Sequence, residues 1–205
     1  MDEVFLAGLM CRGLEPEQIS EMTTIKAESL ALVPLRRSHA SQLYTILSDP
    51  RLYDFIPDRP PETIEELEQR YSLLEKGTSP DGRELWLNWA VFTTADWRPV
   101  GIMQATVRRG IDADIAYIIS RDVWGVGYGR TATRAMIDHI FTTYDLQAVR
   151  ALVDTRNYRS IGMIETLGLK PVRFIRNADH FKGEASDEYE FVLSYNDWRM
   201  GRNFD

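Results

Sequence analysis

Hydrophobic positions along the chain change spacing repeatedly between residues 24 and 194. Short runs of β-branched and aromatic residues, bounded by proline, glycine or charged turns, predict strands. Between these runs, apolar residues recur at i, i+3, i+4 and i+7, which predicts amphipathic helices. The predicted strands cover residues 24–33, 85–94, 100–107, 112–119, 148–153, 171–175 and 188–194, and the predicted helices cover 38–47, 63–76, 127–141 and 157–167.

Several side chains predict where these elements begin and end. Ser38, Thr63 and Asn157 are expected to cap helix N-termini, because their side-chain oxygens can accept hydrogen bonds from backbone amides. Gly168 is expected at the C′ position of the last helix. Residues 48–62 are interrupted by proline and predict a loop. A second polar loop is expected over residues 177–187, between the last two strands.

The order of these elements predicts a mixed α/β fold. It reads β-α-α-β-β-β-α-β-α-β-β, with three strands in an antiparallel meander before residue 120. The helix over residues 127–141 then connects two strands in a parallel crossover. We expect one domain over residues 24–205, preceded by an N-terminal extension over residues 1–23.

A glycine-rich turn separates the strand over residues 112–119 from the helix that follows it. Backbone amides without covering side chains, at the positive end of a helix dipole, predict an anion cradle, and the natural anion is a diphosphate. The spacing of these glycines leaves only a loose variant of the dinucleotide-binding fingerprint, starting from Gly127, and it does not fit the P-loop. The cradle is expected to comprise Gly125, Val126, Gly127, Tyr128, Gly129 and Arg130.

Composition limits the possible partners. The chain has 205 residues, 27% of them charged, and a net charge of −7. An acidic body disfavours a general nucleic-acid binder and suits a cationic substrate such as an amine. Cys11 is the single cysteine, which fits a reducing cytoplasm, and no apolar run reaches membrane-spanning length. We therefore expect a cytoplasmic monomer or homodimer that binds neither nucleic acid nor membrane.

Two motifs resemble those of a known family. The run from Trp124 to Gly129 is similar to motif A of the GNAT N-acetyltransferase superfamily, [Q/R]-x-x-G-x-[G/A], in the form found in its RimJ/RimL-like branch. Asn157-Tyr-Arg-Ser160 followed by Leu167-Gly168-Leu169 resembles a second signature of that branch. The order of elements between residues 25 and 194 is also that of the GNAT fold. The resemblance implies a mostly antiparallel sheet that splays apart between residues 112–119 and 148–153.

The resemblance also implies a co-substrate, acetyl-CoA. Its pantetheine arm would pair with the backbone of the splayed strand, and its diphosphate would lie on amides from Val126 to Arg130. An N–H near Tyr117 or Ile118 would polarise the thioester carbonyl. The residues expected to bind acetyl-CoA are Ile118, Ile119, Trp124, Gly125, Val126, Gly127, Tyr128, Gly129, Arg130, Asn157 and Ser160.

The chemistry implied is direct attack of a primary amine on the thioester, without a metal. The acceptor would be a protein or peptide N-terminus or a small-molecule amine. Ser160 is the expected acid that protonates the leaving thiolate, with Tyr158 as the alternative. Asp114, or its neighbour Asp112, is the candidate base, unless the proton leaves through water. Residues expected to contact the acceptor are Asp54, Phe55 and Tyr117.

Two other classes of protein are alternatives to an acetyltransferase. The branch usually places a glutamate where this chain has Thr131, so a non-catalytic CoA-binding protein with the GNAT fold is a second hypothesis. A nucleotide-dependent oxidoreductase would need an acidic residue about 20 residues past the glycines. Asp145 lies near that distance, but the antiparallel meander before the glycines argues against this class.

Overall fold

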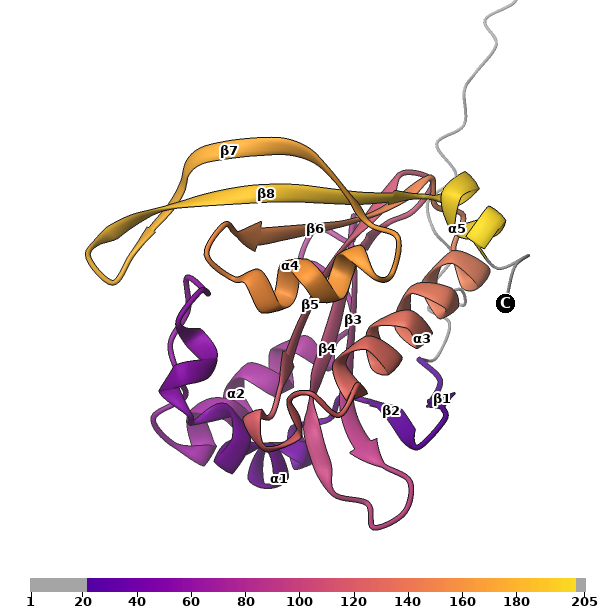
Figure 1. Cartoon of the computed structure of the whole chain (residues 1–205). Coiled ribbons are helices and arrows are strands. Elements are labelled where there is room, and N and C mark those ends of the chain that lie inside the picture. Colours follow the sequence, from indigo (N-terminus) through magenta and orange to yellow (C-terminus); the bar gives the residue numbers. More distant parts are fainter. Residues whose placement is uncertain (1–21, 202–205) are drawn as a thin grey trace, which may run out of the picture.

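A single mixed sheet runs through the protein, in the strand order β1-β2-β3-β4-β5-β6-β8-β7 (Figure 1). The structure is a computed structural model that describes residues 22–201. The strands are β1 (Ile25–Ala27), β2 (Leu30–Pro34), β3 (Leu85–Thr93), β4 (Pro99–Arg108), β5 (Asp112–Ile119), β6 (Ala148–Asp154), β7 (Lys170–Phe181) and β8 (Glu184–Ser194). The α-helices are α1 (Ala40–Leu47), α2 (Ile64–Leu74), α3 (Tyr128–Thr143), α4 (Tyr158–Glu165) and α5 (Tyr195–Gly201).

The expected topology is confirmed. Strands β1 to β5 form an antiparallel meander, and α3 then leads to β6, which pairs with β5 in parallel. The antiparallel β7–β8 hairpin completes the sheet through β8, which pairs with β6. Except for Met22 and Thr23, the expected extension over residues 1–23 lies outside the described residues. The Thr23 carbonyl accepts a hydrogen bond from Trp89 Nε1 at 3.4 Å.

Helices cover both faces of the sheet (Figure 1). Helices α3 and α4 lie on one face and α1 and α2 on the other, so that two hydrophobic clusters form. Burial of each large apolar side chain contributes about 1.5–3 kcal/mol to folding. The first cluster includes Trp89, Met103, Met136, Ile140 and Ile164, and the second includes Leu43, Tyr71 and Phe92, all fully buried. No helix within residues 22–201 is long and apolar enough to span a membrane.

Two predictions near the N-terminal end are wrong. Residues 24–33 form a hairpin of two strands, because Glu28 adopts a left-handed conformation (φ 50°) that reverses the chain. Apolar residues on both sides of this turn hide the reversal in the sequence. Ser38 does not cap a helix, since it lies inside the 3-10 helix η2 (Arg37–His39) that precedes α1.

The predicted polar loop over residues 177–187 is also wrong. These residues complete the β7–β8 hairpin, and only Lys182 and Gly183 separate its strands. The hairpin extends beyond the helices (Figure 1), so its side chains show little hydrophobic alternation. A bulge interrupts β7 between Ile175 and Asp179, where the Asn177 amide donates a hydrogen bond to Asp187 at 2.8 Å.

Three predicted helix boundaries are confirmed by their hydrogen bonds. The Thr63 hydroxyl accepts a bond from the Glu66 amide at 3.2 Å. The side chain of Asn157 accepts one from the Ser160 amide at 3.1 Å. At the end of α4, the amide of Gly168 donates to the Glu165 carbonyl at 3.0 Å and the amide of Leu169 to the Ile164 carbonyl at 3.3 Å, the pairing of a Schellman motif.

Candidate active site

A cleft of about 780 Å³ opens where β5 and β6 diverge. The two strands pair only from Asp112 to Asp114 on β5, opposite Ala148 to Arg150 on β6. Beyond Asp114 and Arg150, β5 and β6 form no further residue pair within residues 22–201. The cleft is lined by residues 51, 52 and 54–56 of the segment after α1, by the end of β5, by the glycine turn and by the first turn of α4.

The backbone of β5 presents free hydrogen-bonding groups to this cleft. The Ser120 amide donates to the Val100 carbonyl on β4 at 2.8 Å. Because alternate residues of an antiparallel strand face the same neighbour, Ile118 pairs with β4 through its backbone. The N–H and C=O groups of Tyr117 and Ile119 therefore face the opening. This differs from the expected backbone role of Ile118, which lines the cleft and packs against the second hydrophobic cluster.

One of these backbone groups already has a partner. Trp124 Nε1 donates a hydrogen bond to the Ile119 carbonyl at 2.9 Å. The groups left at the open edge are the N–H and C=O of Tyr117 and the N–H of Ile119. They alternate as donor, acceptor and donor along the edge, which is the pattern that pairs with an extended chain containing amides.

The glycine turn places unpaired amides at the N-terminus of α3. Gly127 lies immediately before the helix and has φ 97°, a conformation that strains any residue with a Cβ. The amides of Gly127 and of the first helical residues, up to Arg130, have no backbone acceptor among residues 22–201. Val126 differs from the expectation, because its amide donates to the Val123 carbonyl at 3.3 Å. The Tyr128 side chain packs against the hydrophobic core.

Two hydroxyl groups meet across the cleft. The Tyr117 hydroxyl on β5 lies 2.6 Å from Ser160 Oγ on α4. Burial raises the pKa of Tyr117 to about 12, although the hydrogen bond with Ser160 acts in the opposite direction. Tyr117 is therefore protonated at neutral pH, and either hydroxyl can donate this hydrogen bond. The sequence predicted both residues for the site, but not their contact, because 43 positions separate them.

The sequence matches the profile of the family described as "Acetyltransferase (GNAT) domain" over residues 29–170, which is more than half of the chain. The protein belongs to the GNAT acetyltransferase family. The RimJ/RimL-like assignment within the GNAT family stays a prediction.

Individual GNAT proteins support the fold. The chain is 32% identical over 81 residues to an uncharacterized N-acetyltransferase, p20, of Bacillus licheniformis, which covers 40% of this chain and 46% of that protein. The chain thus spans about half the length of the curated relatives it matches. A spermidine N-acetyltransferase from Vibrio cholerae, solved with CoA and spermine, matches with a TM-score of 0.71 and 19% identity over 83% of this chain and 98% of that one. The ribosomal-protein-S5-alanine acetyltransferase from Vibrio fischeri matches with a TM-score of 0.73 and 18% identity over 85% of this chain and 98% of that one.

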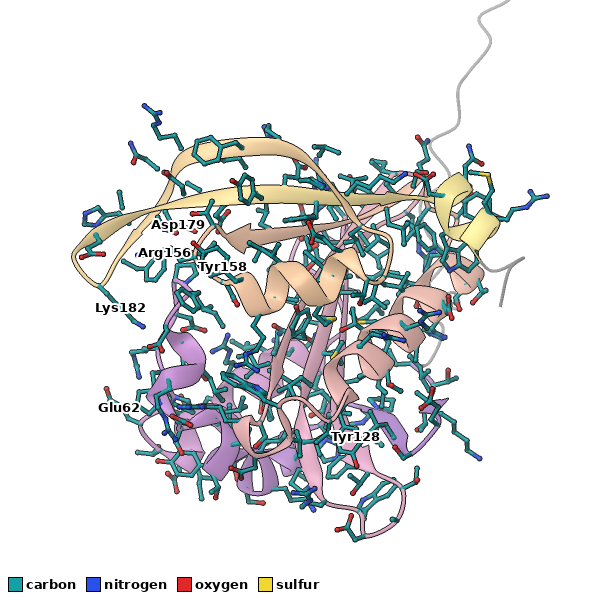
Figure 2. All side chains as sticks on the ribbon, viewed as in Figure 1. Glu62, Tyr128, Arg156, Tyr158, Asp179 and Lys182 are labelled. Carbon is teal, nitrogen blue, oxygen red and sulfur yellow. The ribbon has the colours of Figure 1, made fainter. Side chains whose placement is uncertain are left out.

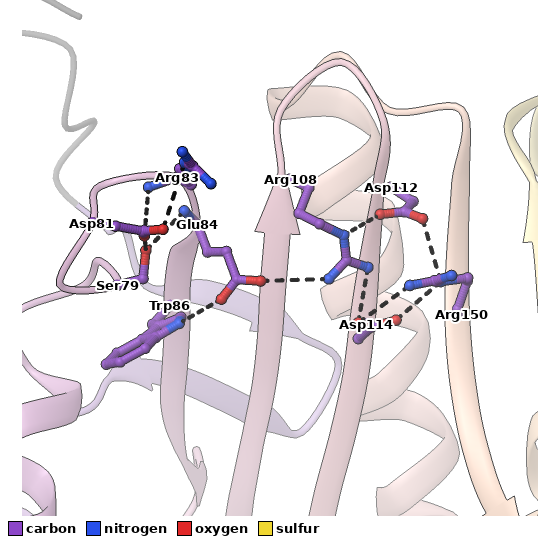
Figure 3. Close-up of polar contacts among 9 residues, drawn as sticks. All are labelled: Ser79, Asp81, Arg83, Glu84, Trp86, Arg108, Asp112, Asp114 and Arg150. Atoms are coloured by element: carbon purple, nitrogen blue, oxygen red, sulfur yellow. Dashed lines mark hydrogen bonds and ion pairs between the residues drawn. The ribbon is translucent and has the colours of Figure 1, made fainter.

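Asp114 is not among the residues that line the cleft. Its carboxylate lies 2.8 Å from Arg108 NH2 and 3.0 Å from Arg150 Nε, in the network of Figure 3. Asp112 belongs to the same network, 2.6 Å from Arg108 Nε. Neither aspartate lines the cleft. The geometry therefore does not support either carboxylate as the base, since both bind arginines at the paired end of β5 and β6.

Tyr158 lines the rim of the cleft, and its residue surface is 78% exposed. Ser160, two residues further along α4, carries the hydroxyl that contacts Tyr117. The geometry therefore favours Ser160 over Tyr158 as the acid.

The loop expected to hold the acceptor has its carboxylates already paired. Lys182, at the tip of the β7–β8 hairpin, points toward this loop (Figure 2), and its Nζ lies 2.7 Å from the Tyr53 carbonyl and 3.7 Å from Asp54. Phe55 faces the cleft, with the Arg156 guanidinium 5.9 Å from its ring. The three other acidic residues of the loop also form ion pairs: Asp49 with Arg51, Asp58 with Arg70, and Glu62 with Arg59.

Arg156 was not predicted for the site. It follows β6 and is held by Asp154, with Nε–Oδ1 and NH2–Oδ2 distances of 3.0 and 2.7 Å. Burial would raise the pKa of Asp154, but hydrogen bonds from Arg156 and Ser186 outweigh it and lower this pKa to about 2. Residues 22–201 contain no group of three or more His, Cys, Asp or Glu side chains that could hold a metal ion.

Proposed function

We propose that this protein is an N-acetyltransferase that transfers the acetyl group of acetyl-CoA to a primary amine. The observation that supports this function is the conjunction, in one cleft, of three features. These are the free backbone edge of β5, the unpaired amides at the start of α3, and the hydroxyl pair of Tyr117 and Ser160. Each corresponds to one part of the co-substrate: the pantetheine arm, the diphosphate and the thioester.

The residues present fit acetyl-CoA. The pantetheine arm contains amides, which can pair with Tyr117 and Ile119 as a further strand would. The amides from Gly127 to Arg130 suit a diphosphate, because the helix dipole adds to their hydrogen bonds. Asn157 and Ser160, at the start of α4, line the other side of the cleft. Trp124 closes the edge of β5 through its bond to Ile119.

Acetyl-CoA supplies an activated acyl group, and the protein positions and polarises it. The Tyr117 N–H faces the opening beside its own side chain, where it can donate to the thioester oxygen as negative charge develops there. The amine nitrogen forms the new C–N bond with the acyl carbon as the C–S bond breaks. The amine gives up one proton to water, because neither Asp112 nor Asp114 reaches the cleft.

The two hydroxyl groups complete the proton transfer. Ser160 Oγ donates its proton to the departing thiolate, and the Tyr117 hydroxyl donates to Ser160 in turn. Water then reprotonates the Tyr117 phenolate. A thiol has a pKa of about 8.5, so modest assistance from an acid is sufficient. With its pKa raised to about 12 by burial, Tyr117 remains protonated throughout the physiological range.

Two kinds of acceptor are the leading candidates. One solved relative is named for an alanine of ribosomal protein S5 and another for spermidine. A peptide N-terminus has a pKa of about 8, so more of it is neutral and nucleophilic than of a lysine side chain. A polycation would have to displace Lys182 to reach the carboxylate of Asp54, at 3.7 Å. The present site therefore favours an N-terminal amine.

An amine panel tests the proposal. Purified protein is given acetyl-CoA together with alanyl peptides, spermidine, free amino acids or an N-terminally blocked lysine peptide, and free CoA thiol is measured with time. We expect amine-dependent thiol release, fastest with an unblocked peptide. If acetyl-CoA binds but no amine accelerates thiol release, the non-catalytic CoA-binding hypothesis replaces the enzyme.

A further inference from the structure

The cleft contains arginines that form no close ion pair among residues 22–201. Of the arginines that line it, Arg51 pairs with Asp49 and Arg156 with Asp154. The remaining three form no ion pair with another residue of the described chain. They are Arg121, Arg130 and Arg159. In a protein with a net charge of −7, this local excess of positive charge indicates a site for an anion with several charges.

Two of these arginines contact the same tryptophan. The Arg159 guanidinium lies 4.3 Å from the centre of the Trp124 ring and the Arg121 guanidinium 5.2 Å from it. Trp124 is itself fixed by the hydrogen bond from Nε1 to Ile119. Cation–π contacts hold a guanidinium in place while leaving its N–H groups free to donate. We call Arg121, Trp124 and Arg159 the arginine clamp.

The arginine clamp joins the two sides of the cleft. Arg121 opens the 3-10 helix η4 (Arg121–Val123), just after β5, whereas Arg159 lies in the first turn of α4. Guanidinium groups bind phosphate bidentately, and two of them fixed beside one ring provide a preformed seat for one phosphate group.

The phosphates of CoA can be divided between the available groups. The diphosphate has the amides from Gly127 to Arg130 and the guanidinium of Arg130, all at the start of α3. The 3′-phosphate is a monoester with about two negative charges at pH 7. The cations left for it are Arg121 and Arg159. We infer that the arginine clamp binds the 3′-phosphate, so that the protein selects acetyl-CoA over its 3′-dephospho form. This inference rests on the proposed function.

Equilibrium binding of CoA and 3′-dephospho-CoA tests it, by calorimetry at constant ionic strength. We expect the wild type to prefer CoA at least tenfold, and Arg159→Gln and Arg121→Gln each to reduce that preference several-fold. The dissociation constant of each variant for 3′-dephospho-CoA should stay within about threefold of the wild-type value. Arg51→Gln is the matched control, since it removes a positive charge from the same cleft outside the clamp and should leave the preference unchanged.

The outcomes separate the two proposals. Equal loss of affinity for both ligands in the Arg121 and Arg159 variants would overturn the inference, because the clamp would then hold the diphosphate. A wild type that binds both ligands equally would overturn the inference alone. A wild type that binds neither ligand would overturn the proposed function and the inference with it. Thermal unfolding of each variant confirms that the comparison is made between folded proteins.

Discussion

The two ends of the β5–β6 pair have opposite characters. At one end Asp112 and Asp114 on β5 lie within 3.3 Å of Arg150 on β6, and Arg108 extends the network to β4 (Figure 3). At the other end, past Asp114, the strands separate and the backbone groups of Tyr117 and Ile119 face the cleft. The two strands thus change from closed to open within a few residues.

This difference shows how a sheet can hold an opening without falling apart. Unpaired backbone groups in a sheet are costly unless water or a ligand satisfies them. At the closed end, ion pairs and backbone hydrogen bonds hold the two strands together. The sheet therefore stays intact without hydrogen bonds between the strands at the open end. The open end is then free to bind an extended ligand. Substitutions at each end of the β5–β6 pair test this division.

Gly127→Val should remove the anion cradle at the open end. A β-branched residue at φ 97° carries a conformational cost of about 1–2 kcal/mol and displaces the amides that follow it. We expect affinity for acetyl-CoA to fall by more than about 100-fold. Gly162→Ala in α4 is the control, since Gly162 has open space around it and does not line the cleft. Unchanged affinity in Gly127→Val would rule out the cradle.

Ser160→Ala should slow the chemistry at the open end and spare binding. Loss of the hydroxyl removes the acid beside the thiolate, so kcat should fall by about 100-fold. The dissociation constant of acetyl-CoA, measured by calorimetry, should stay within about twofold of the wild-type value. Tyr158→Phe, in the same turn of α4, should leave kcat unchanged. An unaltered kcat in Ser160→Ala would exclude its role as the acid.

Arg150→Gln should weaken the closed end. It leaves Asp112 and Glu190, with side chains 14% and 12% exposed, without one of their cations. We expect the free energy of unfolding in urea to fall by about 2 kcal/mol, less than for a fully buried pair. Arg83→Gln, which breaks the exposed pair with Asp81 at 3.6 Å, should change it by less than about 0.5 kcal/mol. Equal effects of the two substitutions would contradict the special role of the closed end.

Asp154→Asn should reveal a pH-dependent contribution where β6 ends. The pKa of Asp154 is lowered to about 2, below the value of about 3.9 in an unfolded chain. Its stabilisation is therefore present above pH 4 and is lost as the pH falls toward 2. The variant should be less stable than the wild type by about 1–2 kcal/mol at pH 7. The difference, measured by urea unfolding at several pH values, should narrow below pH 4; a constant difference would contradict the lowered pKa.

The order of elements could be predicted because local patterns determine it. Thr63, Asn157 and Gly168 terminate helices through bonds to residues at most five positions away. Both strands of the β7–β8 hairpin were predicted in part, but its outer end was missed because Asp179 and its neighbours show no apolar alternation. The turn at Glu28 was missed because its left-handed conformation has no glycine to indicate it.

The sequence predicted individual residues of the site, but it could not predict the contacts between them. Motif residues located Gly127, Ser160 and Tyr117, because each lies in or beside a recognisable run. Which atoms face the opening depends on the register of β5 against β4, which a single sequence does not reveal. The ion pairs that remove Asp114 from the cleft likewise join residues on three different strands. Arg156 belongs to no motif, so only the fold brings it to Phe55.

The contact between Tyr117 and Ser160 has one further consequence for the cleft. It ties β5 to α4 at 2.6 Å through two side chains of the protein itself, so contacts within the chain set the separation of the two walls. A pre-shaped slot loses little conformational entropy when it is filled. Coenzyme affinity should therefore depend on the rigidity that this contact provides, and a substitution that loosens the two walls should first increase the rate of coenzyme dissociation.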